Sequence, residues 1–151
     1  MRSLIVLALS TLAISNSVAA ETWLVGSIAS YHLQRDKDYC EFNPGIGVEH
    51  DIAKNTRAVI GQYNNSFCLP SAYLGISYTP LTLGNFRLGS AFIAVSGYGD
   101  AIKKKNEQQD ILLAPLGVIS YERGKYGVNL VLVPPHGDFK GAMGVQVKVK
   151  F

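Results

Sequence analysis

Hydrophobic and polar residues alternate without interruption over the last ten residues of the chain, 142–151. One face carries Met143, Val145, Val147, Val149 and Phe151, and the other carries Ala142, Gly144, Gln146, Lys148 and Lys150. A period of two predicts a β-strand. One face suits hydrocarbon and the other suits water or a polar interior. An apolar face that ends in an aromatic is typical of the last strand of an outer-membrane barrel.

Seven further segments have the character of strands and are separated by turn residues. With the last one they occupy residues 22–33, 42–52, 56–65, 71–79, 86–98, 111–121, 126–133 and 142–151. The links after the second, fourth and sixth segments are short, and those after the first, fifth and seventh are longer, as in outer-membrane barrels. We therefore predict an all-β fold, an eight-stranded antiparallel transmembrane β-barrel of the outer-membrane type. A soluble lipocalin-like barrel is the alternative.

The first of these segments predicts which residues face lipid. Trp23, Val25, Ala29 and Tyr31 share one face, with an aromatic residue near each end. Outer-membrane barrels place aromatic residues at both membrane interfaces, so we expect this face to point outward. His32 then points into the barrel.

Residues 1–20 have the features of a signal peptide. Arg2 supplies the positive charge, residues 4–14 form an apolar core too short to span a bilayer as a helix, and residues 18–20 are small. We expect export through the Sec pathway to the outer membrane, with residues 21–151 as a single barrel domain. Removal of Arg2 lowers the formal net charge from +3 to +2. This weak excess does not suggest a nucleic-acid partner, and no motif indicates a cofactor or metal.

The chain has two cysteines, Cys40 and Cys68, and both lie in the exported part. Two cysteines in an oxidising compartment predict a disulfide. The predicted topology places both in loops at the outer end of the barrel. These loops flank one hairpin, so the Cα atoms can come within the roughly 7 Å that a disulfide requires.

His32 and Ser66 are the candidates for chemistry. The topology places His32 at the outer end of the first strand and Ser66 just after the third. An imidazole is the usual base that activates a serine hydroxyl. The alternatives are a polar histidine of the lumen or a loop, and a serine that only forms a turn. His50 and His136 have no serine in a comparable place, and we expect them to be surface residues.

An ordered set of short motifs resembles the lipid A palmitoyltransferase family (PagP type). The motifs are Tyr31-His32, Pro44-Gly45-Ile46-Gly47, Asn65-Ser66-Phe67, Asn85-Phe86-Arg87-Leu88-Gly89, Leu112-Leu113-Ala114-Pro115-Leu116, Val133-Pro134 and the final Phe151. Members of this family are eight-stranded outer-membrane barrels that move an acyl chain from a phospholipid to lipid A. The set extends over most of the chain after Tyr31.

The resemblance implies a function and a site. His32, Ser66 and Asn65 correspond to catalytic positions, with His32 activating Ser66 or an acceptor hydroxyl and Asn65 orienting the group. The implied partners are phospholipid and lipid A, and we expect a monomer. Two features depart from the family. Asn65 stands where the family has Asp, which removes a carboxylate, and the family's amphipathic helix before the first strand is absent.

Three prolines suggest openings in the barrel wall, because proline has no N–H to donate to a strand ladder. Pro115 and Pro134 face the same seam near the outer end, where missing bonds would form a lateral gate for an acyl chain, as in the family. Pro44 resembles one side of a second opening in the family, with Ser27 roughly where its partner would be. Ordinary prolines at strand ends are the alternative.

Small residues predicted to point inward suggest a shaft for one acyl chain. They are Gly45, Gly47, Gly75, Gly89 and Ala91. They equally suit a narrow barrel in which small residues relieve crowding. Two other functions stay open: a non-catalytic membrane barrel that presents its loops to a partner, and a soluble periplasmic barrel that binds an apolar ligand.

Overall fold

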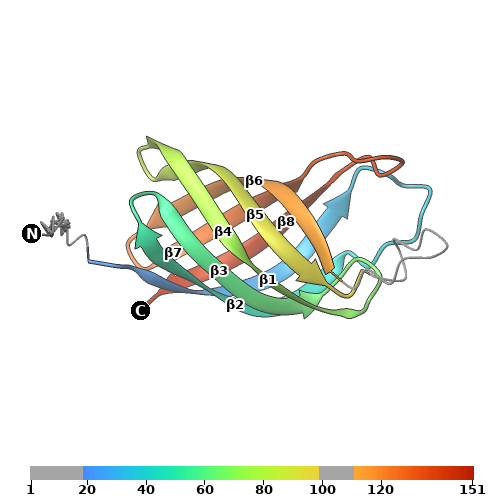
Figure 1. The fold of residues 1–151 in the computed structure, drawn as a ribbon, viewed down its shortest axis with the longest axis horizontal. Coiled ribbons are helices and arrows are strands. Elements are labelled where there is room, and N and C mark those ends of the chain that lie inside the picture. The colour runs from blue at the N-terminus through green and yellow to red at the C-terminus, as the bar shows by residue number, and fades with distance from the viewer. Residues whose placement is uncertain (1–18, 99–110) are drawn as a thin grey trace, which may run out of the picture.

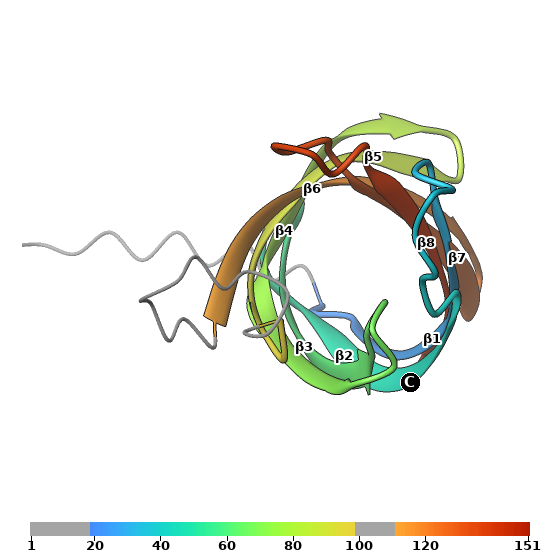
Figure 2. The same ribbon diagram turned by 90° about the vertical axis from the view of Figure 1, so that its right-hand side faces the viewer.

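The computed structural model describes residues 19–98 and 111–151, which form one closed barrel of eight antiparallel strands in sequence order. β1 pairs with β2 on one side and with β8 on the other, which closes the ring (Figure 2). The predicted all-β fold, strand count and closure are confirmed. The described residues include no apolar helix of membrane-spanning length.

The strands lie close to their predicted positions. They are β1 (Thr22–His32), β2 (Phe42–Ala53), β3 (Thr56–Asn64), β4 (Pro70–Leu83), β5 (Phe86–Ser96), β6 (Ile111–Arg123), β7 (Tyr126–Val133) and β8 (Ala142–Lys150). β4 continues past its predicted end at Thr79. Pro80 lies at a shift in register between Tyr78 and Leu81, where it interrupts no regular ladder bond.

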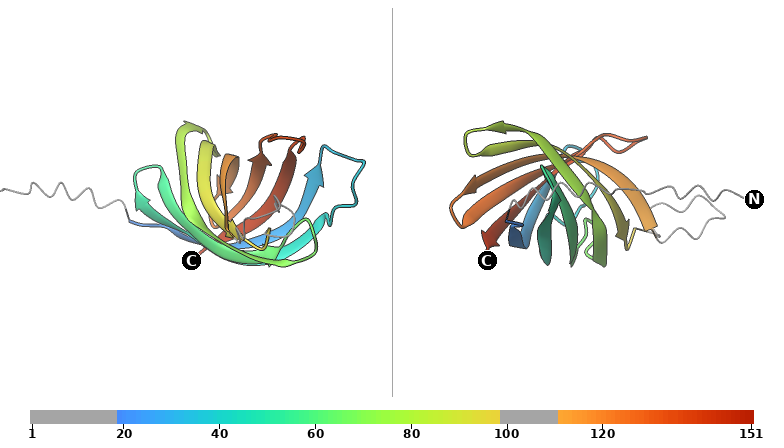
Figure 3. Two further views of the ribbon diagram at one scale, coloured as in Figure 1. Left: turned by 45° about the vertical axis from the view of Figure 1, so that its right-hand side comes forward. Right: turned by 60° about the vertical axis from the view of Figure 1, so that its left-hand side comes forward.

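The connections divide the barrel into two ends (Figures 1 and 3). The turn end carries the tight turns after β2, β4 and β6, together with the start of β1 and the finish of β8. The loop end carries the longer connections after β1 and β7 and the one after β3. The predicted signal peptide lies almost wholly outside the described residues, as does most of the connection after β5.

Side chains alternate between the lumen and the outer surface, as predicted for β8. Val145 and Val147 are exposed on the outside, whereas Lys148 is buried inside the barrel. The other strands place large apolar side chains outside in the same way, among them Ile60, Leu74, Ile76, Phe92 and Leu113. The lumen instead holds most of the buried polar residues.

The predicted outward face of β1 was wrong for its first half. Trp23 and Val25 are each only 1% exposed and point into the lumen. The register of β1 shifts between Ser27 and Ala29, and one extra residue at such a bulge reverses the faces that follow. Beyond the shift Tyr31 is exposed and His32 is buried, as predicted.

Charged side chains fill the lumen near the turn end. This lumenal charge cluster consists of four acidic and four basic residues: Glu21, Glu49, Asp51, Glu122, Arg57, Arg87, Lys148 and Lys150. Arg57 Nε donates to Asp51 Oδ1 at 2.6 Å, and Lys148 Nζ donates to Glu122 Oε1 at 2.7 Å. Equal numbers of opposite charges compensate one another, as buried charges require. The cluster occupies the lumen at the turn end.

Candidate functional site

The fold brings His32 and Ser66 together at the loop end. His32 is the last residue of β1, and Ser66 lies in the connection between β3 and β4. His32 Nε2 is 2.8 Å from Ser66 Oγ, although the two residues are 34 positions apart. This distance allows the imidazole to accept the serine proton directly.

Aromatic side chains hold the imidazole of His32 in place. The ring stacks on Tyr39 with a centroid distance of 4.1 Å and an interplanar angle of 14°. Phe139, from the connection between β7 and β8, contacts it edge-on at 6.2 Å. His32 is only 2% exposed, so its orientation is set by packing rather than by solvent.

The two loops that carry the site are joined covalently. Cys40 and Cys68 form the predicted disulfide, with their Cα atoms 5.5 Å apart. The backbone N–H of Cys40 also donates to the carbonyl oxygen of Ser66 at 2.8 Å. These two bonds join the loop after β1 to the loop after β3, which keeps Ser66 close to His32.

Asn65 adjoins Ser66 and is bonded to the surrounding backbone and to Ser71. Its side chain is fully buried and donates to Ser71 Oγ at 3.0 Å and to the carbonyl oxygen of Gly97 at 2.8 Å. Its Oδ1 accepts the N–H groups of Phe67 and Leu69. All these contacts stabilise the loop that carries Ser66, and none of them reaches His32.

A carboxylate that the sequence analysis missed lies on the other side of the imidazole. Glu41 Oε1 is 3.8 Å from His32 Nδ1 and accepts the backbone N–H of His32 at 3.2 Å. Arg35 Nη1 donates to the same oxygen at 2.6 Å. The hydrogen bond from the His32 amide, with the nearby Arg35, lowers the pKa of Glu41 and keeps it ionised. The sequence offered one signal for Glu41, namely that it directly follows Cys40 of the predicted disulfide.

Two tyrosines border the site on the side of β3 and β5. The hydroxyl oxygens of Tyr63 and Tyr98 are 2.9 Å apart. Burial raises the pKa of Tyr98, so its hydroxyl stays protonated and neutral. Tyr98 and Ser66 both line the same pocket, which gives the serine a neutral polar neighbour.

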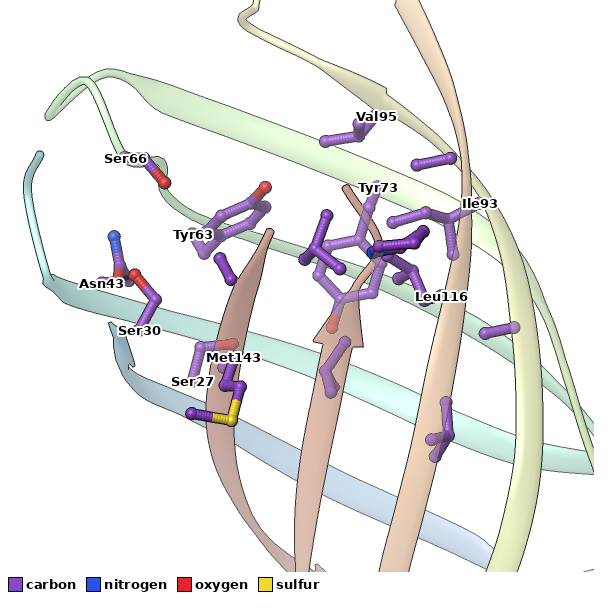
Figure 4. Close-up of a pocket in the computed structure, with 18 of the residues that line it drawn as sticks. Ser27, Ser30, Asn43, Tyr63, Ser66, Tyr73, Ile93, Val95, Leu116 and Met143 are labelled. Carbon is purple, nitrogen blue, oxygen red and sulfur yellow. Dashed lines mark hydrogen bonds between the residues drawn. The ribbon is translucent and has the colours of Figure 1, made fainter. Parts of the chain in front are cut away.

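A cavity of about 1030 Å³ leads from His32 and Ser66 into the barrel. Figure 4 shows Ser66, Tyr63 and Leu116 among the residues that line it. At its far end it meets the lumenal charge cluster at Glu49 and Arg57. Its walls between the two ends are largely apolar and include Val59, Ala91, Ile93, Leu116, Val118 and Val131. The volume is at the upper limit of the roughly 300–1,000 Å³ that is usual for small-molecule sites.

The four glycines predicted to line an acyl-chain shaft lie against neighbouring strands and the Tyr73 side chain instead. A Cβ atom on Gly47 would collide with the Tyr73 hydroxyl, so this glycine makes room for the tyrosine ring. A Cβ on Gly45, Gly75 or Gly89 would meet the backbone of a neighbouring strand. The cavity wall is formed by larger side chains together with Gly137 and Gly144, where a Cβ would have no atom closer than 3.9 Å.

Pro115 and Pro134 lie at one seam of the barrel. The β6–β7 ladder runs only from Arg123↔Tyr126 to Gly117↔Leu132, and among the described residues the β6 stretch 111–116 pairs with β5 alone. Extending the register by two residues sets Pro115 opposite Pro134, and neither can donate an N–H. The wall between β6 and β7 therefore lacks ladder bonds at the loop end, next to the cavity.

Pro44 lies at a different seam. Ser27 pairs with Gly45, and the register shift that follows reaches Ala29↔Phe42. The β1–β2 ladder continues on both sides of Pro44, so this proline accompanies the bulge and does not share the β6–β7 seam.

Within residues 19–98 and 111–151, no group of three or more His, Cys, Asp or Glu residues is arranged to hold a metal ion. A serine, an imidazole and a carboxylate lie beside an apolar cavity at the loop end. The chain matches no model of a known protein family and no curated protein.

Proposed function

We propose that this barrel spans an outer membrane. Large apolar side chains are exposed around the wall, and contiguous apolar surfaces of this extent are unusual on soluble monomers. A closed barrel satisfies its own backbone hydrogen bonds, as lipid requires. The unheated protein should migrate faster than the heated protein on a detergent gel. Solubility without detergent would contradict the proposal and favour the soluble ligand-binding barrel.

We propose further that the site transfers an acyl chain between lipids of the outer leaflet, from a phospholipid to lipid A. The observation that carries this proposal is the 2.8 Å contact between His32 Nε2 and Ser66 Oγ at the mouth of an apolar cavity. The cavity suits a hydrocarbon chain, and the contact is that of a base with its nucleophile. The exchange of one ester for another changes the free energy little, so the transfer needs no cofactor to supply energy.

The proposed reaction uses these two side chains as nucleophile and base. Ser66 Oγ attacks the ester carbonyl of the donor while its proton passes to His32 Nε2. The ester C–O bond then breaks, and the leaving alkoxide takes the proton from His32. In the second half, His32 accepts the proton of the acceptor hydroxyl, and the acceptor oxygen attacks the acyl carbon. The bond between that carbon and Ser66 Oγ then breaks, and Ser66 Oγ takes the proton back from His32. Alternatively, His32 activates the acceptor hydroxyl for direct attack on the donor ester.

The seam between β6 and β7 is the proposed entrance for the acyl chain. The missing ladder bonds beside Pro115 and Pro134 leave this part of the wall held by β5 on one side only. A chain that enters here reaches the cavity without passing through the loops, so the polar headgroup can stay at the membrane surface.

Mass spectrometry of lipid A and phospholipids, from cells with and without the protein, tests the transfer. We expect a lipid A species heavier by one acyl chain and a matching lysophospholipid. Ser66→Ala and His32→Gln should remove both products. The matched controls are Ser90→Ala and His50→Gln, which change exposed residues outside the site. If neither lipid pool changes when the wild-type protein is expressed, the enzyme proposal is wrong.

The alternative function is a non-catalytic membrane barrel that presents its loops to a partner. The lumenal charge cluster favours it, because long charged side chains fill the lumen at the turn end, as expected where the interior only supports the barrel. Unchanged lipid pools, combined with heat-modifiable migration on gels, would favour this alternative.

A further inference from the structure

We propose that Glu41 is a positioning residue that holds His32 in its active tautomer. The inference rests on the proposed function, because it concerns the same histidine. Glu41 Oε1 is 3.8 Å from His32 Nδ1, on the side of the ring opposite Ser66. No catalytic role was expected for Glu41 from the sequence.

The imidazole itself requires such a partner. For Nε2 to accept the Ser66 proton, Nδ1 must carry the hydrogen of the neutral ring. His32 Nδ1 is buried and has no hydrogen-bond partner among the described residues. An unpartnered buried N–H is unfavourable, so an acceptor within reach favours the tautomer that points its hydrogen toward it. Glu41 is the carboxylate in that position.

The backbone holds Glu41 near the ring. Its carboxylate accepts the amide N–H of His32, which fixes it to the residue whose side chain it serves. The preceding residue, Cys40, is bonded to Cys68 and to the carbonyl of Ser66. A shift of about 1 Å in the carboxylate would bring Oε1 to normal hydrogen-bond distance from Nδ1.

Arg35 competes with the imidazole for the same oxygen. Its Nη1 lies 2.6 Å from Glu41 Oε1, and its side chain is 59% exposed. An exposed ion pair of this kind contributes little to stability, so the Arg35 contact alone does not explain the position of Glu41. The other groups packed against His32 are Tyr39, Phe139 and Ser66, which are uncharged, and Lys37, His136 and Asp138 line the same cavity.

The tautomer of His32 can be measured by the ¹⁵N chemical shifts of its ring in the refolded full chain in detergent micelles. The chain has three histidines, so His50→Gln and His136→Gln leave His32 as the only signal. We expect the Nδ1–H tautomer to predominate when the ring is neutral. Glu41→Gln should reduce this preference severalfold, and Glu41→Ala should reduce it further. An unchanged tautomer ratio in both variants would overturn the proposal.

Arg35→Gln is the control that separates positioning from a surface ion pair. It removes the group that competes with His32 for the Glu41 carboxylate. The preference of His32 for the Nδ1–H tautomer should therefore hold or increase, whereas Glu41→Gln should lower it. Equal effects of the two variants would show that only the ion pair matters. In the transfer assay, Glu41→Gln should lower kcat at least tenfold with little change in KM. The spectroscopic result does not depend on activity, so failure of the transfer proposal would be recognised separately.

Discussion

The ammonium group of Lys148 lies 4.9 Å from the centre of the Trp23 ring, inside the barrel. Arg57 and Lys150 approach the same ring at 5.5 and 5.4 Å. A cation over the face of an indole is attracted by the negative charge of the ring face, more strongly where water is excluded. Trp23 is therefore part of the polar interior and not of an aromatic girdle facing lipid.

The position of Trp23 predicts the result of fluorescence quenching by lipids. Trp23 is the only tryptophan of the chain, so its emission can be measured without ambiguity. In vesicles that contain brominated phospholipids, the wild-type protein should be quenched weakly. The matched control is Trp23→Phe combined with Leu24→Trp, which moves the indole to the exposed neighbouring position and should be quenched strongly. Equal quenching of both proteins would contradict the inward position of Trp23.

Removal of Arg57 should destabilise the barrel. Its guanidinium contacts Glu49, Asp51 and Glu122, and its loss leaves several acidic groups without their partner. Removal of one member of a buried ionic network costs about 3–5 kcal/mol. We expect a loss of this size for Arg57→Ala in the free energy of unfolding, measured with urea in lipid vesicles.

Two further variants test the origin of that loss. Arg123→Ala, which removes an exposed arginine at the neighbouring turn, should change the stability by no more than about 0.5 kcal/mol. Adding Asp51→Asn to Arg57→Ala should recover part of the stability, because it removes one uncompensated charge. A double variant less stable than Arg57→Ala would show that packing, and not charge, accounts for the effect.

Local periodicity was enough to predict most of the fold. The pattern of β8 survives in the structure because Val145 and Val147 meet the outside while Lys148 finds acidic partners inside. The pattern failed at β1, where a bulge reverses the faces and nothing local identifies the extra residue. Trp23 suits either face by hydrophobicity alone. Only the cations that approach it from β3 and β8 determine its position.

The site was predictable in part for a similar reason. His32 and Ser66 could be paired because an alternating topology places the ends of β1 and β3 at the same end of the barrel. Glu41 was not found because its approach to His32 depends on the path of the loop after β1, which has no periodic pattern. The partners of Asn65 could not be predicted, because Ser71 lies on β4 and Gly97 follows the end of β5.

Loss of the disulfide should affect activity as well as stability. Cys40 and Cys68 are separated by 28 positions, and the chain-entropy model assigns about 3–4 kcal/mol to a loop of that length. Replacement of both cysteines by serine should lower the stability by an amount of this order. It should also reduce acyl transfer, because the loops that carry Ser66 and Glu41 are no longer joined.

Reduction of the wild-type protein by dithiothreitol provides the comparison. It should reproduce the loss of transfer, whereas the same treatment should leave the double serine variant unchanged. Full activity of the reduced wild-type protein would show that the hydrogen bond between the Cys40 N–H and the Ser66 carbonyl is enough to hold the loops.

The seam between β6 and β7 predicts that a cross-link there blocks the entry of the donor lipid. Leu116 and Val133 both line the cavity, and extension of the β6–β7 register sets them opposite each other, one step beyond the last pair, Gly117↔Leu132. Leu116→Cys combined with Val133→Cys should form a disulfide that joins the unpaired part of the wall. With the bond verified by mass spectrometry, we expect transfer to fall at least tenfold.

The control is Val118→Cys with Val131→Cys, a pair that is already opposed in the β6–β7 ladder and also lines the cavity. Its cross-link should leave transfer unchanged, because that part of the wall is closed in any case. If the Leu116–Val133 cross-link lowers acyl transfer no more than the control cross-link does, the donor reaches His32 and Ser66 through the loops. The seam is then only an irregularity caused by two prolines.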